Sequence, residues 1–351
     1  MATPVSGREA LLGIKRSATW GTASTIAANC ALNAEWTTNP NRQRLPLREI
    51  GSGRTFTSTV VNGNMLPSAS LAGDAGYGNN FDLLLALLFG TAPAPSEAHV
   101  GQGDYVHTIT WADAVTTHFA TVAQKIDSAT VKEMPTAQVS SVTVSCTSGV
   151  PGVVQYSAEL LGNDLLTVGA TNTTTTLGNA TFRDTTPIVL RNADYFAVNA
   201  QGGAGLAGGD KFAVVGFSVT YQRPLELVSE ARGTAGVSAP TPQDLCVGTL
   251  ELTIKSFDST TFDFYNEFRN ENAFKANLLI TGSAIGTGFR SLDLRFPSLK
   301  LNEATPNLTA PGRNPFSLKF EILEAASLPT GMTSKRPYIA LTNTQTTSLL
   351  A

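Results

Sequence analysis

Few residues in this sequence stand at spacings that support catalysis. Gly203, Gly205 and Gly208, in the stretch GGAGLAGGD, satisfy the pattern GxGxxG. That pattern holds a dinucleotide only where a strand precedes it and a helix N-terminus follows, because the helix start supplies the backbone N–H groups that bind the pyrophosphate. The residues that follow here, KFAVVGFSVTY, predict a strand instead. We therefore interpret the glycines as a loop between strands.

The histidines and cysteines do not form a pattern that binds metal or attacks a substrate. No histidine lies three or four residues from a cysteine or another histidine, no CxxC pair exists, and GxSxG is absent. The residues considered are His99, His107, His118, Cys30, Cys146 and Cys246. We expect no catalytic residue, no metal and no cofactor, and we expect the chain not to be an enzyme. An enzyme on a β-sandwich scaffold is kept as an alternative.

Arginines gather in two long segments that carry little regular pattern. A long loop in a compact domain is uncommon unless it is functional or disordered. The charges are either solvated or reach carboxylates of a neighbouring subunit, for which the guanidinium fork is suited. As contacts between subunits we expect, together with Tyr338 near the end of the chain, Arg42, Arg44, Arg48, Arg54, Arg223 and Arg232.

Composition limits the partners of the chain. Of 351 residues, 42% are hydrophobic and only 15% are charged, against about a quarter in ordinary proteins. So few charges favour a surface that partners cover. The net charge of −3 argues against a protein that grips nucleic acid, but it permits one that lets nucleic acid pass. We find no secretion signal and no apolar run long enough to span a membrane.

The elements that would position these residues are mostly strands. Apolar and polar residues alternate in VTVSC (142–146), in the stretch from Val154 to Leu160 and in FSLKFEI (316–322), which predicts half-buried antiparallel strands. Two segments predict helices. FDLLLALLFG (81–90) has Asn79 or Asn80 as a cap, Asp82 in its first turn and Gly90 at its end. TFDFYNEFRNENAF (261–274) has Thr261 as a cap.

The order of these elements occurs twice along the chain. Phe81-Asp82 aligns without a gap on Phe262-Asp263, about half a chain later, and 140–162 resembles 297–325 as a strand, a Gly/Pro loop and a strand. We predict a first domain over 1–165, a Thr-rich linker over 166–188, a second domain over 189–330 and a C-terminal arm over 331–351 that needs a partner to be ordered. This Thr-rich segment is expected to be either a linker or an extended surface ribbon.

The opening GIKRSATWGTA (13–23) and the stretch SASLAGDAGYGNNFDLLLALLFG (68–90) resemble the major tail tube proteins of long-tailed, siphovirus-type bacteriophages. The resemblance implies a mainly β fold. Here that means two tandem tail-tube-like β-sandwich units, each with one flanking helix, whose inner sheets join between subunits into a β-barrel. It implies a structural virion protein that polymerises into stacked rings, the conduit for DNA ejection. It also implies that the tail is assembled in the host cytoplasm.

The resemblance also implies partners. The chain pairs with itself, as trimeric pseudo-hexameric rings or alternatively as hexameric rings. Tape measure, tail tip and terminator proteins bind the tube ends, and DNA passes without specific binding. We expect ring-to-ring contacts from the N-terminal segment, the 42–67 loop and the C-terminal arm. Another β-rich virion protein, for decoration or adhesion, is the alternative function.

Overall fold

The computed structural model describes residues 10–46, 60–229, 237–255, 263–303 and 316–351. It is mainly β and antiparallel, as the alternating pattern predicts. The strands of the first part of the chain are β1 (Leu12–Ser17), β2 (Glu35–Asn39), β3 (Arg42–Pro46), β4 (Val60–Met65), β5 (Ser68–Asp74), β6 (Gly76–Gly78), β7 (Gly90–Thr91), β8 (Ser96–Glu97), β9 (Tyr105–Trp111), β10 (Phe119–Lys125), β11 (Val131–Cys146), β12 (Gly152–Val153) and β13 (Gln155–Gly162).

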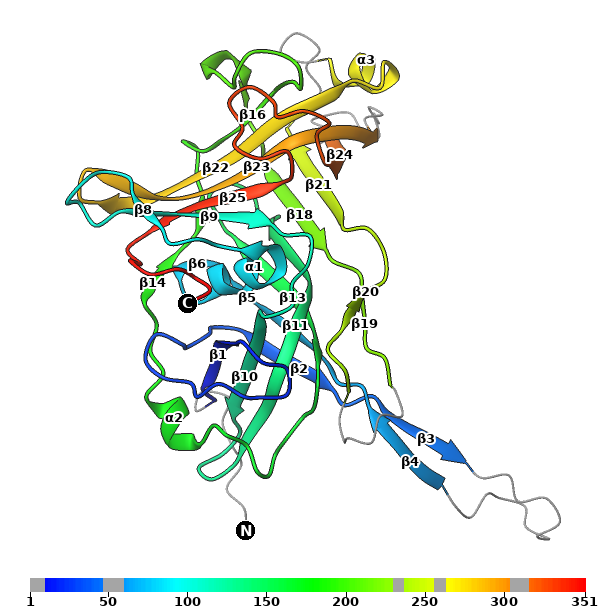
Figure 1. Cartoon of the computed structure of the whole chain (residues 1–351). Helices are drawn as coiled ribbons and strands as arrows, with labels where there is room; N and C mark the ends of the chain where they lie inside the picture. Colours follow the sequence, from blue (N-terminus) through cyan, green and yellow to red (C-terminus); the bar gives the residue numbers. More distant parts are fainter. Residues whose placement is uncertain (1–9, 47–59, 230–236, 256–262, 304–315) are drawn as a thin grey trace, which may run out of the picture.

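The later strands and the helices complete the described fold (Figure 1). The strands are β14 (Asp184–Pro187), β15 (Val189–Leu190), β16 (Tyr195–Ala200), β17 (Lys211–Phe212), β18 (Gly216–Gln222), β19 (Leu225–Glu226), β20 (Thr241–Pro242), β21 (Val247–Ile254), β22 (Ala273–Ile285), β23 (Gly288–Glu303), β24 (Phe316–Leu323) and β25 (Tyr338–Asn343). The helices are α1 (Phe81–Phe89), α2 (Thr174–Gly178) and α3 (Phe264–Arg269), and one 3-10 turn spans Gly208–Asp210. That turn leads into β17, so a strand follows the glycine pattern.

Eight strands form one continuous antiparallel row in the order β2–β5–β13–β11–β18–β21–β24–β23. The pairing of β11 with β18 joins the earlier part of the chain to the later part. β2 stands at one end of the row, and at the other end the row residue Lys300 of β23 also pairs with Ala273 of β22. Residues as distant in sequence as Glu35 and Phe320 therefore share a single sheet.

The two halves of this row repeat their order and their register. Trp36 pairs with Leu71, and Phe217 pairs with Leu252. The sequence spacing from Trp36 to Phe217 equals the spacing from Leu71 to Leu252 (36 to 217, 71 to 252). That distance is also the one that aligns Phe81 with Phe262. The helix ends repeat at the same spacing. Gly90, after α1, has φ 89°, and Glu271, after α3, has φ 51°.

A β-bulge repeats at the same place in both halves. The register of β11 against β13 shifts between Val139 and Ser141, and that of β23 against β24 shifts between Leu301 and Glu303 (139 to 301, 141 to 303). A bulge marks a defined feature of a sheet rather than a random irregularity. We call two positions counterparts when they are related by one of these two spacings. Around β2, β5 and α1 the spacing is that from Trp36 to Phe217. Along β11 it is that from Val139 to Leu301.

The first part of β11 and of β23 belongs to a second set of pairings. β1 and β10 pair in turn beside the start of β11. β16, β22, β23, β25 and β9 pair in series, so β25 and β9 form a second link between early and late parts of the chain. One hydrophobic cluster includes residues from both parts, among them Leu71, Leu84, Leu252 and Phe320.

Helix α1 is the centre of this core, and all nine of its residues are buried. It contacts β6, β9 and β11 (Figure 1). Gly90 ends it, as predicted, and its N–H donates to the Ala86 carbonyl. At the other end Asn80 occupies the cap position without a side-chain cap bond, whereas Asn79 Oδ1 accepts from the Phe81 N–H at 3.3 Å.

The second predicted helix is shorter than the sequence indicates. α3 ends at Arg269, and 273–285 form β22, so the helical stripe to Phe274 was wrong. The left-handed Glu271 turns the chain, and Phe274 and Ala276 then face the core with the period of a strand. Asp263 caps α3 by accepting from the Asn266 N–H, and Thr261 lies outside the described residues.

The Thr-rich segment is not simply an extended ribbon. Thr173 and Thr176 form a reciprocal capping box, which starts α2. The helix packs the buried Leu177 against Ile26, Ala123 and Val131. The threonine hydroxyls of this low-complexity segment therefore bond to N–H groups at the start of a helix. Composition alone does not reveal this role.

The C-terminal arm is ordered against its own chain, which corrects the expectation that it needs a partner. β25 lies between β23 and β9 and buries Tyr338, Ile339 and Leu341. Leu349 and Leu350 are buried as well. β23 and β9 supply the strand partners of the arm within the same chain.

The junction of β9 with β25 makes stability depend on pH. Buried His107 places Nε2 3.1 Å from Asn343 Oδ1 and 3.1 Å from the Gln345 carbonyl, while its Nδ1 is buried without a partner among the described residues. Burial lowers the pKa of His107 below its ordinary 6.5. The unfolded chain therefore binds the proton more readily, so stability is full above pH 6.5 and falls as the pH drops through that value.

We expect His107→Gln, which keeps an N–H donor, to flatten the loss of unfolding free energy between about pH 6.5 and 5. Denaturant titrations across this range measure the slope. His118, whose pKa is also lowered by burial, contributes in the same direction, so His118→Gln is the comparison variant. An unchanged slope in His107→Gln would show that this ring does not carry the effect.

Candidate functional site

The eight-stranded row has one apolar face and one polar face. Its apolar face packs into the core, with Trp36, Leu71, Tyr156, Val219 and Phe320 all buried. The opposite face consists of cross-strand rows of small polar side chains. One row runs through directly paired positions of all eight strands, namely Glu35, Ala72, Ser157, Thr143, Thr220, Thr249, Glu321 and Lys300. We call this surface the polar face.

The polar face carries more negative than positive charge. The positions paired along the row contribute six carboxylates and two ammonium groups, a balance of −4, from Glu35, Asp74, Glu159, Glu251, Glu303, Glu321, Lys300 and Lys319. Partial burial raises the pKa of Glu159. Hydroxyl side chains occupy most of the remaining positions, so the face is hydrophilic. Such a surface repels phosphate groups instead of binding them.

The junction between β11 and β18 lies at the middle of the row. Six residue pairs join the two strands, from Ser141 with Gln222 to Cys146 with Phe217. On the polar face Thr143 Oγ1 and Thr220 Oγ1 lie 2.9 Å apart. On the core side Val142, Val144, Val219 and Tyr221 are buried. The junction thus has the pattern of any interior strand pair.

Arg223 closes this junction directly after β18. It is only 2% exposed, although it carries a charge. Its guanidinium donates to the carbonyls of Leu88 (3.3 Å), Asp113 (3.2 Å) and Ala112 (2.8 Å), and it lies over the Trp111 ring. Leu88 is in the last turn of α1, where carbonyls without helical partners favour a cation. Arg223 therefore ties β18 to the end of α1.

The arginines expected at subunit contacts fall into different places. Arg42 and Arg44 are exposed on β3, which forms a hairpin with β4 that projects from the body (Figure 1). Arg223 is buried within its own chain, and Tyr338 is 2% exposed with its hydroxyl donating toward Met332 and accepting from the Thr333 N–H. Arg48, Arg54 and Arg232 lie outside the described residues.

Asp82 and Arg183 form a buried pair that the sequence did not indicate. Arg183 Nη2 lies 2.8 Å from Asp82 Oδ1 and 3.1 Å from Asn80 Oδ1. Asp82 is fully buried in the first turn of α1, where it also accepts from the Leu83 N–H. The sequence predicts only a dipole role for Asp82, because its partner lies far along the chain in the Thr-rich segment.

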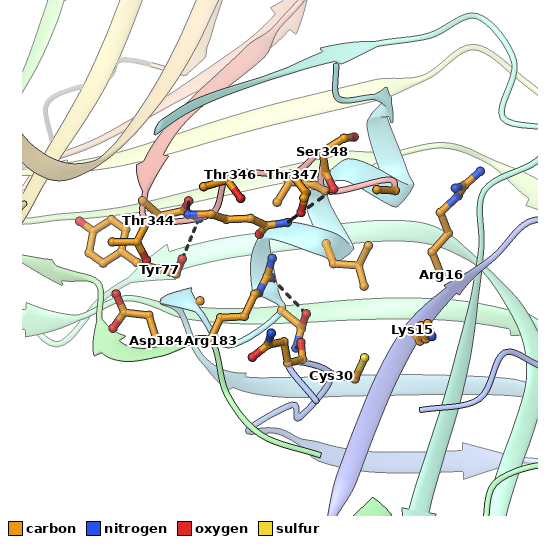
Figure 2. Close-up of a pocket in the computed structure, with 18 of the residues that line it drawn as sticks. Lys15, Arg16, Cys30, Tyr77, Arg183, Asp184, Thr344, Thr346, Thr347 and Ser348 are labelled. Carbon is orange, nitrogen blue, oxygen red and sulfur yellow. Dashed lines mark hydrogen bonds between the residues drawn. The ribbon is translucent and has the colours of Figure 1, made fainter. Parts of the chain in front are cut away.

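A hollow of about 500 Å³ lies beside this pair (Figure 2). Arg183, Tyr77, Cys30 and the C-terminal residues 343–349 line it, and Figure 2 shows Arg183 and Asp184 facing the segment from Thr344 to Ser348. No histidine lines it, and Arg183 is already bound to Asp82. Within the described ranges no group of three His, Cys, Asp or Glu side chains stands close enough to hold a metal.

No helix in the described part of the chain is both long and apolar enough to cross a membrane.

The chain matches a known protein family. Residues 7–322 match the family model described as phage tail tube protein, which covers nearly the whole chain. No curated protein matches the sequence.

Proposed function

We propose a function from the premise that this chain belongs to the phage tail tube protein family. It is a structural protein of the virion tail. Its copies polymerise into stacked rings that form the tube through which DNA is ejected. The observation that carries this proposal is the eight-stranded row with one net-negative polar face, built from two four-stranded groups in series.

The chain is a tandem duplication of one tube unit. The shared strand order, the repeated bulge and the repeated helix end support this interpretation. We keep 1–165 and 189–330 as the bounds of the two units. Two units per chain favour rings of three chains with six similar positions, and rings of six chains are the alternative.

The ends of the row supply the contacts between subunits. Among the described strands, β2 pairs only with β5, so its other edge is unpaired. Unpaired strand edges invite association, and closure into a barrel removes them. In the proposed ring, β2 of one subunit joins the β23 end of the next, just as β18 joins β11 within one chain. The polar face then lines the lumen.

Each proposed partner has a role in this assembly. DNA passes along a net-negative, hydroxyl-rich lumen that does not hold it. Tape measure, tail tip and terminator proteins bind the tube or its ends, and assembly takes place in the host cytoplasm. A decoration or adhesin protein would instead form closed, discrete oligomers that do not stack into a tube.

Negative-stain electron microscopy of the concentrated protein tests the proposal. We expect hollow stacked rings whose end-on averages show three-fold symmetry and six similar lobes. Rings with six whole chains would contradict the stoichiometry alone. Compact particles without a lumen would contradict the tube.

The charge of the polar face provides a separate prediction. In the double variant Glu159→Lys and Glu251→Lys the balance of the face changes from −4 to 0. We expect tubes of this variant to retain DNA in a gel-shift assay at low salt and to release it as salt rises. The control Asp127→Lys and Asp244→Lys makes the same charge change away from the polar face. If both double variants retain DNA equally, the charge of the polar face does not control the passage of DNA.

A further inference from the structure

The junction inside one chain shows how Arg223 holds two four-stranded groups together. Its backbone N–H donates to the Ser140 carbonyl at 2.7 Å, next to the bulge of β11. Its guanidinium reaches the Leu88 carbonyl in the last turn of α1. Arg223 therefore bonds to β11 through its backbone and to α1 through its side chain.

The counterpart of Arg223 is Arg42. Both are arginines, and each follows a paired aromatic residue, Phe217 or Trp36, at the same spacing (217 to 223, 36 to 42). Arg42 differs in one respect, since it is exposed on β3. Among the described strands of one chain, no second group lies beside β2, so Arg42 has no helix end to reach there.

The counterparts of the groups that bind Arg223 lie together at the other end of the row. Ser140 corresponds to Asn302 (140 to 302), and Leu88 corresponds to Arg269 in the last turn of α3 (88 to 269). Both Asn302 and Arg269 line a hollow of about 430 Å³. This hollow sits between the end of α3 and the end of β23, where the described pairing of β23 with β22 stops at Lys300 and leaves Leu301 and Asn302 without a β22 partner.

The polar groups of this hollow differ from those at the internal junction. The Ala112 and Asp113 carbonyls that bind Arg223 follow β9, one of the strands that lie between α1 and β10. No strand lies between α3 and β22, so this end of the row has no equivalent of those carbonyls. The hollow instead contains the carboxylates of Glu267 and Glu271, together with the cations of Arg269 and Lys300. Two carboxylates and the carbonyls at a helix end supply acceptors for a guanidinium.

We propose that Arg42 of one subunit occupies the hollow at the end of α3 in the neighbouring subunit, which is a second copy of this chain. Its backbone N–H faces the Asn302 carbonyl, and its guanidinium binds the carbonyl end of α3 and the nearby carboxylates. This contact repeats the internal Arg223 junction between subunits. It rests on the proposed function, because it requires β2 to join the β23 end of another copy.

Ring assembly by Arg42 variants measures how much this contact stabilises the ring. A hydrogen bond to a charged group is worth about 1.5–3 kcal/mol, so we expect Arg42→Ala to raise the concentration for half-maximal ring assembly by about tenfold or more, measured by light scattering. Arg42→Lys, which keeps the charge and loses the fork, should fall between Arg42→Ala and wild type. The counterpart of Arg44 is Leu225, so the internal junction gives Arg44 no matching role, in contrast to the expectation from sequence that it contacts a subunit. Arg44→Ala removes the same charge from the same exposed strand and should change assembly less than about threefold.

The unfolding temperature of the unassembled chain serves as the folding control. It should be unchanged in Arg42→Ala because Arg42 is exposed in the single chain.

Disulfide cross-linking tests the position independently. In a background with Cys30→Ser and Cys246→Ser, we expect an Arg42→Cys chain mixed with an Asn302→Cys chain to give a cross-linked dimer on a non-reducing gel. Each variant alone should give none. A Val100→Cys chain mixed with Asn302→Cys is the matched control, because Val100 is 93% exposed and lies in the turn between β8 and β9, outside the paired strands.

The outcomes separate this inference from the proposed function. Wild-type rings that form normally, together with an unaffected Arg42→Ala and no specific cross-link, would overturn the Arg42 contact and leave the tube in place. A wild-type chain that stays monomeric at all concentrations would overturn both.

Discussion

Replacing Arg183 with methionine is expected to destabilise the folded chain by about 3 kcal/mol, the lower end of the range for breaking a buried ion pair. The variant leaves the Asp82 carboxylate fully buried without its cation. The Leu83 N–H and the N-terminal end of α1 still stabilise that carboxylate, which is why the lower end applies. Denaturant unfolding of the unassembled chain measures the loss.

A second substitution shows whether the uncompensated charge is the cause. Adding Asp82→Asn to Arg183→Met removes that charge, so we expect the double variant to recover most of the lost stability. The exposed pair of Lys319 with Glu303, 3.2 Å apart, is the control, and Lys319→Ala should change the unfolding free energy by less than about 1 kcal/mol. If Arg183→Met is as mild as Lys319→Ala, the pair does not hold α1 in place.

Truncating Leu84 to alanine is expected to cost about 2–5 kcal/mol, the usual range for a fully buried leucine. Leu84 is 0% exposed and lies in the cluster that contains residues from both four-stranded groups. The cavity would weaken that shared core, so we expect one cooperative transition that shifts as a whole. Thermal and chemical unfolding, followed by circular dichroism, measure both features.

The control for Leu84→Ala is Leu328→Ala, because Leu328 is 53% exposed. That variant should change stability by less than about 0.5 kcal/mol. A split into two transitions in Leu84→Ala would contradict a single shared core. It would show instead that the two four-stranded groups unfold separately.

Local patterns in the sequence were enough to predict much of this protein. The alternation of polar and apolar residues predicted strands such as β13 and β24, whose burial alternates as expected. The leucine run with Gly90 predicted α1 and its end. The family resemblance also came from local stretches, and the family match confirms it. These signals depend on neighbouring residues, so the tertiary structure is not needed to read them.

Contacts between distant residues were decided only by the tertiary structure. The pairing of β11 with β18, the position of β25 beside β9 and the ion pair of Asp82 with Arg183 all join residues far apart along the chain. A strand pattern shows which face is apolar, but it does not choose the neighbouring strand. That choice follows from packing in three dimensions, which also separates exposed Arg42 from buried Arg223.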